Sequence, residues 1–299
     1  MKFLKVLALC LLSFLLFLSL SIFGIALMLN LAILNPNFVI SEVNKVDLSS
    51  LIKDSLSRQI PMDEPYIAEV VDGTLTDLTP WIKEQVHDII YSTYDYLLEK
   101  RKSLNLDISL QPLKDSLKNN LRKVILRSPP PELAGKSQTE ISQYVSEVNL
   151  YVDEVIPPSF KFSLSTLSSE VLSQLMEIKQ AIGYIQLTYK VLMGFILLLI
   201  LGIILINRKV RGASLNLGII FATCGILEYV GIFITKSLIK PQLPQLKIPP
   251  ALHTWLPQLL DDTLFTLEIF SLGILAAGIA LIIVSFIYKP RQSSPEPQL

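Results

Sequence analysis

Four stretches of the chain carry almost no charged side chains and are each close to the length that crosses a bilayer. They are Val6–Leu34, Val191–Ile206, Ala213–Thr235 and Leu264–Tyr288. Crossing the hydrocarbon core takes about 20 apolar residues of helix. A soluble protein of 299 residues could not bury four such runs in one core. The sequence therefore predicts an all-α integral membrane protein, with transmembrane helices at residues 6–35, 187–207, 213–235 and 264–288.

Between the first two spans lies a polar segment, residues 36–186. Charged residues make up 17% of the chain, against about 25% in soluble domains, and the shortfall comes from the four apolar stretches. From Asn37 to Gln180 the segment carries 21 acidic and 15 basic side chains. Because an excess of acids provides no electrostatic footprint for nucleic acid, we exclude nucleic acid as a partner.

Basic residues lie beside the predicted spans at three points, all on one side of the membrane. They are Lys2 and Lys5, then Arg208, Lys209 and Arg211, and finally Lys289 and Arg291. Because lysine and arginine in short loops concentrate in the cytoplasm, residues 1–5, the loop 208–212 and a disordered tail 289–299 are predicted to be cytoplasmic. The segment 36–186 is then an extracytoplasmic domain, and the proline-rich loop 236–263 lies outside with it. Its stretch from Lys240 to Pro257 is expected to be extended. Lys236, Lys240 and Lys247 in that loop argue mildly against this orientation.

The first span and the cysteine content bear on the cellular setting. The apolar run that ends at Leu34 is much longer than the roughly 7–15 residues of a signal-peptide core, so we expect an uncleaved anchor rather than a cleaved signal. The polar segment has no cysteine, and the chain has no Asn-X-Ser/Thr acceptor. Both absences favour the plasma membrane of a bacterium or an archaeon over a eukaryotic cell surface.

The polar segment shows mostly helical periodicity. Apolar residues recur at steps of three and four over Leu78–Leu98, Leu113–Ile125 and Ile141–Val155. Thr79 followed by Pro80 is typical of an N-cap and a first helical position. Two segments, 104–110 and 159–164, alternate instead. They either pair as a small two-stranded β ribbon or form extended entries into helices.

A further periodic segment runs toward the second span. Apolar residues repeat with heptad-like spacing from Leu164 to Tyr189, and no proline interrupts the chain up to residue 207. This pattern predicts one helix from about residue 165 to 207, which would couple the polar segment to the membrane. The apolar seam, 164–189, either packs within the chain's own bundle or joins a partner protein or a second copy.

No sequence pattern indicates catalysis, a cofactor or a metal. His87 and His253 have no companion at metal-ligand spacing, and motifs such as Gly-X-Ser-X-Gly are absent. The candidate site consists instead of ionisable residues in or next to the predicted spans, Glu228, Glu268 and Lys236, because such groups are costly inside a membrane. Glu228 either forms structural hydrogen bonds or, with Glu268, lines a polar path for a cation or a proton.

These observations favour a non-enzymatic, multi-pass membrane protein. Its acidic helical domain would bind a partner protein, a component of the cell envelope or a second copy of itself, with lipid around its spans. The first alternative is a small channel or transporter subunit that uses Glu228 and Glu268. The second alternative is a membrane-anchored enzyme, which the absence of catalytic motifs disfavours. The predicted cytoplasmic parts are too short for an output domain, so inward signalling would need a partner.

Overall fold

The fold is all-α, and the described part of the chain contains four helices long and apolar enough to cross a membrane, as predicted. The computed structural model describes residues 2–58, 64–130, 133, 135–207 and 209–287; the predicted tail 289–299 and Arg208 lie outside these residues. The chain divides into two compact units. The membrane unit comprises Met1–Asn35, Ala181–Leu246 and Leu256–Leu299, and the polar unit comprises Pro36–Gln180 and Lys247–Trp255.

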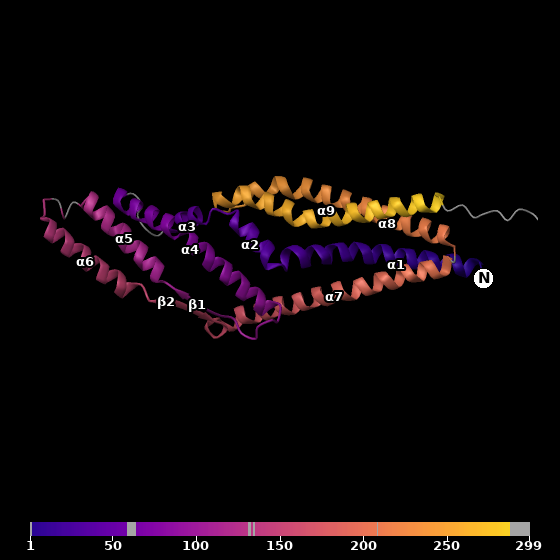
Figure 1. Ribbon diagram of the computed structural model, residues 1–299, viewed down its shortest axis with the longest axis horizontal. Coiled ribbons are helices and arrows are strands. Elements are labelled where there is room, and N and C mark those ends of the chain that lie inside the picture. Colours follow the sequence, from indigo (N-terminus) through magenta and orange to yellow (C-terminus); the bar gives the residue numbers. More distant parts are fainter. Residues whose placement is uncertain (1, 59–63, 131–132, 134, 208, 288–299) are drawn as a thin grey trace, which may run out of the picture. The chain divides into compact units, whose positions relative to one another are not determined.

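The membrane unit contains most of the length of the four long apolar helices, which Figure 1 labels. They are α1 (Lys2–Met28), extended by a π-helical turn (Leu29–Ile33), α7 (Ser169–Asn207), α8 (Val210–Ile239) and α9 (Pro250–Ile287). Leu16 of α1, Ile203 of α7 and Cys224 of α8 are fully buried in one core. Large apolar side chains such as Phe14 and Leu197 cover the outer faces. This surface suits lipid, whose tails are as apolar as leucine.

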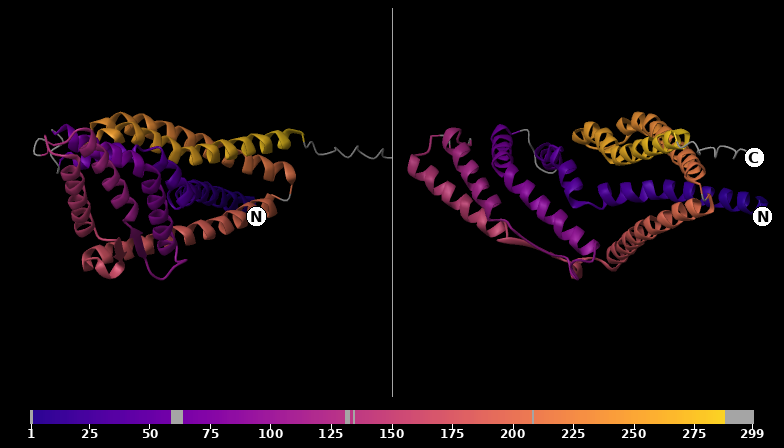
Figure 2. Two further views of the ribbon diagram at one scale, coloured as in Figure 1. Left: turned by 60° about the vertical axis from the view of Figure 1, so that its left-hand side comes forward. Right: turned by 45° about the vertical axis from the view of Figure 1, so that its right-hand side comes forward.

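Glycines bring α8 and α9 into close contact. A Cβ atom at Gly278 of α9 would lie 2.4 Å from the backbone nitrogen of Ala222 in α8. A Cβ atom at Gly225 of α8 would lie 2.6 Å from the carbonyl oxygen of Ser271 in α9. Figure 2 shows the two helices side by side in both views. Small residues at such a contact let two backbones approach within a membrane, where the hydrophobic effect between helices is absent.

The polar unit is built around one long helix. It contains α2 (Pro36–Asn44), α3 (Leu48–Leu56), α4 (Pro65–Leu97), β1 (Asn105–Ser109), α5 (Gln111–Arg127), α6 (Gln138–Val155) and β2 (Ser159–Ser163). α4 packs against α2, α3 and α5, and α6 packs against α5. The segment Lys247–Trp255 belongs to the same unit, and the Trp255 indole Nε1 donates to the carbonyl oxygen of Glu42 at 2.9 Å.

The predicted two-stranded ribbon is confirmed. β1 and β2 pair antiparallel, with Asp107 opposite Lys161. Leu106 and Ile108 face Phe162 and Phe160 across the ribbon, so one face is apolar. The predicted helix ends before the prolines are also confirmed, since α5 ends at Arg127 and α6 at Val155.

The predicted helix start at Thr79 is wrong. α4 runs unbroken from Pro65 to Leu97, with Pro80 inside it. Instead of capping a helix, the Thr79 hydroxyl donates to the carbonyl oxygen of Leu75 at 2.8 Å. Pro80 and Thr76 are exposed, so water can reach the Thr76 carbonyl that a proline at position 80 leaves without its helical donor. The helix therefore tolerates the proline on its outer side.

The prediction that the stretch from Lys240 to Pro257 is extended is wrong as well. α8 continues to Ile239, a 3-10 turn covers Lys240–Gln245, and α9 already begins at Pro250 and passes through Pro257. Proline fits the first helical turn because the amide hydrogens there have no helical acceptor. Only Pro257 removes a hydrogen bond from the helix, and membrane helices accept such a loss.

The long helix α7 is confirmed as continuous to Asn207, but it begins at Ser169 rather than near residue 165. Leu164–Thr166 form a 3-10 turn, and the backbone of Leu167 is extended. The first two leucines of the heptad-like seam therefore precede the helix.

The glycine contact gives a direct test of the α8–α9 packing. We expect Gly278→Leu to lower the free energy of unfolding in micelles by about 1–3 kcal/mol, because the new side chain must displace the Ala222 backbone. Gly273→Leu on the same helix is the matched control, since a Cβ atom at Gly273 meets no atom within 4 Å. Equal losses in the two variants would contradict the close contact.

Candidate functional site

Two of the three predicted intramembrane residues meet. The Lys236 ammonium of α8 donates to Glu268 Oε1 of α9 at 2.6 Å, and both side chains are mostly buried. Lys236 also lies 3.7 Å from Asp261, which binds Lys240 at 2.5 Å. Sequence reasoning missed Asp261 and Lys240 as partners. The sequence spacing could have identified them. Lys240 follows Lys236 by one helical turn and Asp261 precedes Glu268 by two, so each pair lies on one face of its helix.

Glu228 lies apart from this ladder of ion pairs. It precedes Lys236 by eight residues, which is about 12 Å along the axis of α8. Its partner is Cys224, whose thiol lies 3.5 Å from Glu228 Oε1 and 3.6 Å from the Ser21 hydroxyl of α1. The other carboxyl oxygen, Oε2, is buried without a hydrogen-bond partner within the described part of the chain.

The two groups differ in what they can do. Lys236 and Glu268 neutralise each other, so they act as a clamp between α8 and α9. Glu228 retains one unsatisfied buried oxygen, which a proton, a water molecule or a cation could satisfy. The three predicted residues therefore lie in two separate groups, and Glu228 has an unsatisfied carboxyl oxygen within the described residues.

The heptad-like seam is only partly covered by the chain itself. Tyr189 stacks on Phe23 of α1 with ring centroids 5.2 Å apart, and Ile182 is buried. Val171 and Ile178 are exposed. The seam therefore packs within the chain's own bundle at Ile182 and Tyr189, the end nearer the membrane span, and is exposed nearer its start.

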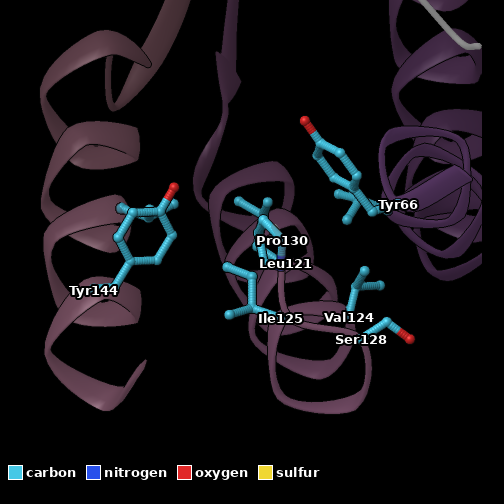
Figure 3. A pocket seen from close by; sticks show the side chains of 9 residues that line it. Tyr66, Leu121, Val124, Ile125, Ser128, Pro130 and Tyr144 are labelled. Atoms are coloured by element: carbon cyan, nitrogen blue, oxygen red, sulfur yellow. The ribbon is translucent and has the colours of Figure 1, made fainter. Parts of the chain in front are cut away.

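In the polar unit, α6 lies on α5 with Val145 and Val152 buried between them. Beside this seam is an apolar cavity of about 100 Å³ between α4, α5 and α6. Figure 3 shows Tyr144 of α6 and Tyr66 of α4 on opposite sides of the cavity, with Leu121 and Ile125 of α5 between them.

A stripe of apolar side chains continues from this cavity along α6. It consists of Tyr144, Val148, Tyr151 and Val155, which recur at helical spacing on one side of the helix, and we refer to it as the α6 flank. Tyr144, Tyr151 and Val155 are 38%, 65% and 57% exposed. Sequence reasoning assigned α6 a single apolar face and missed the tyrosines. Their seven-residue spacing was the available signal.

Charges also hold α6 on α5. Asp153 of α6 binds Lys118 of α5 at 2.5 Å and lies 3.6 Å from Lys114, which is itself buried. The hydrogen bond from Lys118 holds the pKa of Asp153 below its usual value of 3.8, and the positive charges of both lysines act in the same direction. On the opposite side of α5, Arg127 forms an ion pair with Glu69 of α4.

The two histidines have ordinary partners. His87 Nε2 lies 3.0 Å from Asn44 Oδ1, and His253 Nε2 lies 3.1 Å from the carbonyl oxygen of Ile248. Within residues 2–58, 64–130, 133, 135–207 and 209–287, no group of three histidine, cysteine or acidic side chains could hold a metal ion.

Comparison with known proteins adds no relative. No protein-family model matches the chain, and neither a curated protein nor a solved structure is detectably similar to it.

The pKa of Asp153 predicts how the α5–α6 contact depends on pH. Because the folded pKa is lowered, the carboxylate stabilises the fold above about pH 3.8 and loses this effect as the pH falls through the folded pKa. We expect Asp153→Asn to lower the Tm at pH 7, and the difference from the unmodified protein to shrink below pH 3.8. Thermal unfolding across pH measures this. Glu154→Gln, an exposed neighbour, is the control, and a pH-independent deficit in Asp153→Asn would contradict the assignment.

Proposed function

We propose that this chain is a non-enzymatic membrane protein whose polar unit binds an apolar helix of a partner protein along the α6 flank. The observation that carries the proposal is the exposure of this flank beside an apolar cavity. A water-facing helix normally covers or avoids such a stripe, and contiguous exposed apolar surface marks interaction sites. Tyrosine is enriched at protein interfaces because it buries much area at a low entropic cost.

The shape of the site favours a helical protein segment over a small molecule. The α6 flank extends over the twelve residues from Tyr144 to Val155, or about 16 Å, and lies beside the apolar cavity. Grooves that accept an amphipathic helix have this combination of an apolar surface and a hollow. The cavity, at about 100 Å³, is smaller than the roughly 300–1,000 Å³ of small-molecule sites. It has room for one aliphatic or aromatic anchor from the partner.

The orientation of the chain belongs to this proposal. We place the polar unit outside the cytoplasm because Lys2 and Lys5, the basic loop at 208–211 and the basic residues after residue 288 all flank spans on the other side. Lys236 and Lys240, which argue against this orientation, form ion pairs with Glu268 and Asp261. Their positive charges are therefore neutralised within the chain. The sequence features that favour a bacterial or archaeal plasma membrane complete the proposal.

A second candidate function is passage of a proton or a cation past Glu228. The unsatisfied Oε2 atom, with Cys224 and Ser21 beside it, favours this candidate. Glu268 does not contribute to it, because Lys236 already occupies its carboxylate.

Photo-crosslinking in native membranes tests the first proposal. A photoreactive phenylalanine analogue at Tyr151 is expected to link to one protein, through an apolar helical segment that mass spectrometry identifies. The same analogue at Leu150, which is 69% exposed on the other side of α6, is the matched control. Tyr151→Glu should weaken capture at least tenfold, as the loss of a central interface residue does. Equal labelling from both positions would refute the proposal. Adducts formed only with a second copy of the chain would also refute it and would show self-association through the α6 flank instead.

Ion flux into proteoliposomes tests the second candidate. If it holds, vesicles with the protein dissipate a proton or sodium gradient faster than empty vesicles, and Glu228→Gln removes the difference. Tyr229→Phe, a change at the exposed neighbouring residue, should leave flux unchanged. Flux equal to that of empty vesicles, or unaffected by Glu228→Gln, excludes the candidate.

A further inference from the structure

The side of α6 opposite the α6 flank borders a second cavity, which is polar. Its volume is about 290 Å³, and Arg122 of α5 and Gln138, Ser142, Ser146 and Asn149 of α6 line it. We refer to it as the polar cavity. Val145 separates it from the apolar cavity, so α6 presents different chemistry on its two sides.

Arg122 brings an uncompensated positive charge to the polar cavity. Within the described residues it forms neither an ion pair nor a hydrogen bond, whereas Lys118 and Arg127 on the same helix are held by Asp153 and Glu69. Among the residues that the structure describes, no acidic side chain lines the cavity. A free guanidinium offers a planar fork of donors that matches a carboxylate or a phosphate.

Asn149 adds an unsatisfied acceptor. Its Oδ1 atom is buried and has no hydrogen-bond partner within the described residues. Leaving such a group unpaired costs about 1–3 kcal/mol, so native structures usually provide a partner. Ser146 already donates its hydroxyl hydrogen to the Ser142 carbonyl at 3.0 Å, which leaves the Ser146 oxygen free to accept. The cavity thus combines one site for a negative charge with acceptors for hydroxyl or amine hydrogens.

We propose that the polar cavity binds an acidic monosaccharide unit. A carboxylate or phosphate group of the sugar binds Arg122, and one ring hydroxyl donates to the Ser146 oxygen. A second ring hydroxyl donates to Asn149 Oδ1, whose amide turns toward the cavity when the sugar binds and so gains the partner that this buried atom lacks. The volume, near the lower limit of about 300 Å³ for small-molecule sites, suits one sugar ring rather than a longer chain. Neither a neutral sugar nor inorganic phosphate would satisfy both halves of the cavity. This proposal does not depend on the protein-binding role of the α6 flank.

Calorimetric titration of the full chain in zwitterionic nanodiscs tests the proposal. Glucuronate and glucose 6-phosphate are the probes, and we expect at least one to bind with saturation, at least tenfold more tightly than glucose or inorganic phosphate. Arg122→Gln and Asn149→Leu should each weaken that binding at least tenfold. Arg127→Gln, on the same helix but outside the cavity, should leave it unchanged.

Circular dichroism confirms that each variant is folded before titration. Arg122 is exposed, and Arg122→Gln removes no ion pair or hydrogen bond within the described residues. The proposal fails if neither probe saturates. It also fails if phosphate alone binds as tightly as the sugars, or if Arg122→Gln and Arg127→Gln weaken binding equally, because the effect would then be non-specific charge.

Discussion

The contact between α5 and α6 is the interaction on which both cavities of the polar unit depend. Val145 and Val152 fill the seam, and Asp153 fixes the end of α6 through Lys114 and Lys118. A helix packed on one neighbour exposes two sides, and here one side is apolar and the other polar. A shift of α6 along α5 would alter both cavities together, because each takes residues from both helices.

In the membrane unit, the contact between α8 and α9 has the corresponding role. Gly225 and Gly278 let the backbones meet, and the pairing of Lys236 with Glu268 joins one end of the same two helices. Packing and charge therefore act on one pair of elements. A lone Lys236 or Glu268 would be costly in this position, so each residue is tolerable because of the other.

Much of this architecture could be predicted from sequence, where the signal is local. The four spans follow from long apolar runs, and the ribbon follows from alternation in two short segments. The errors came from applying single-residue rules too strictly. Pro80 and Pro257 each remove one amide hydrogen, and a long helix with good contacts elsewhere accepts that loss.

The residues around the sites were harder to predict because they depend on packing between distant segments. Cys224 meets Ser21 across 203 residues, and nothing near Ser21 in the sequence indicates this contact. The Oδ1 atom of Asn149 becomes buried only when α6 packs against α5. The sequence identified Glu228 as an unusual residue, but it did not predict that Glu228 lies apart from the pair formed by Lys236 and Glu268. Local patterns identify which residues are costly, and tertiary packing determines which partners they find.

The segments that make up the polar unit constrain the membrane topology independently of the basic residues beside the spans. Lys247–Trp255 belongs to this unit together with Pro36–Gln180, and Trp255 donates to the backbone of Glu42. Segments that share one folded unit must lie on the same side of a bilayer. Because α7 and α8 are the helices between these two segments, both must cross or neither can. Both helices have the length and apolar composition of membrane spans, which favours crossing by both.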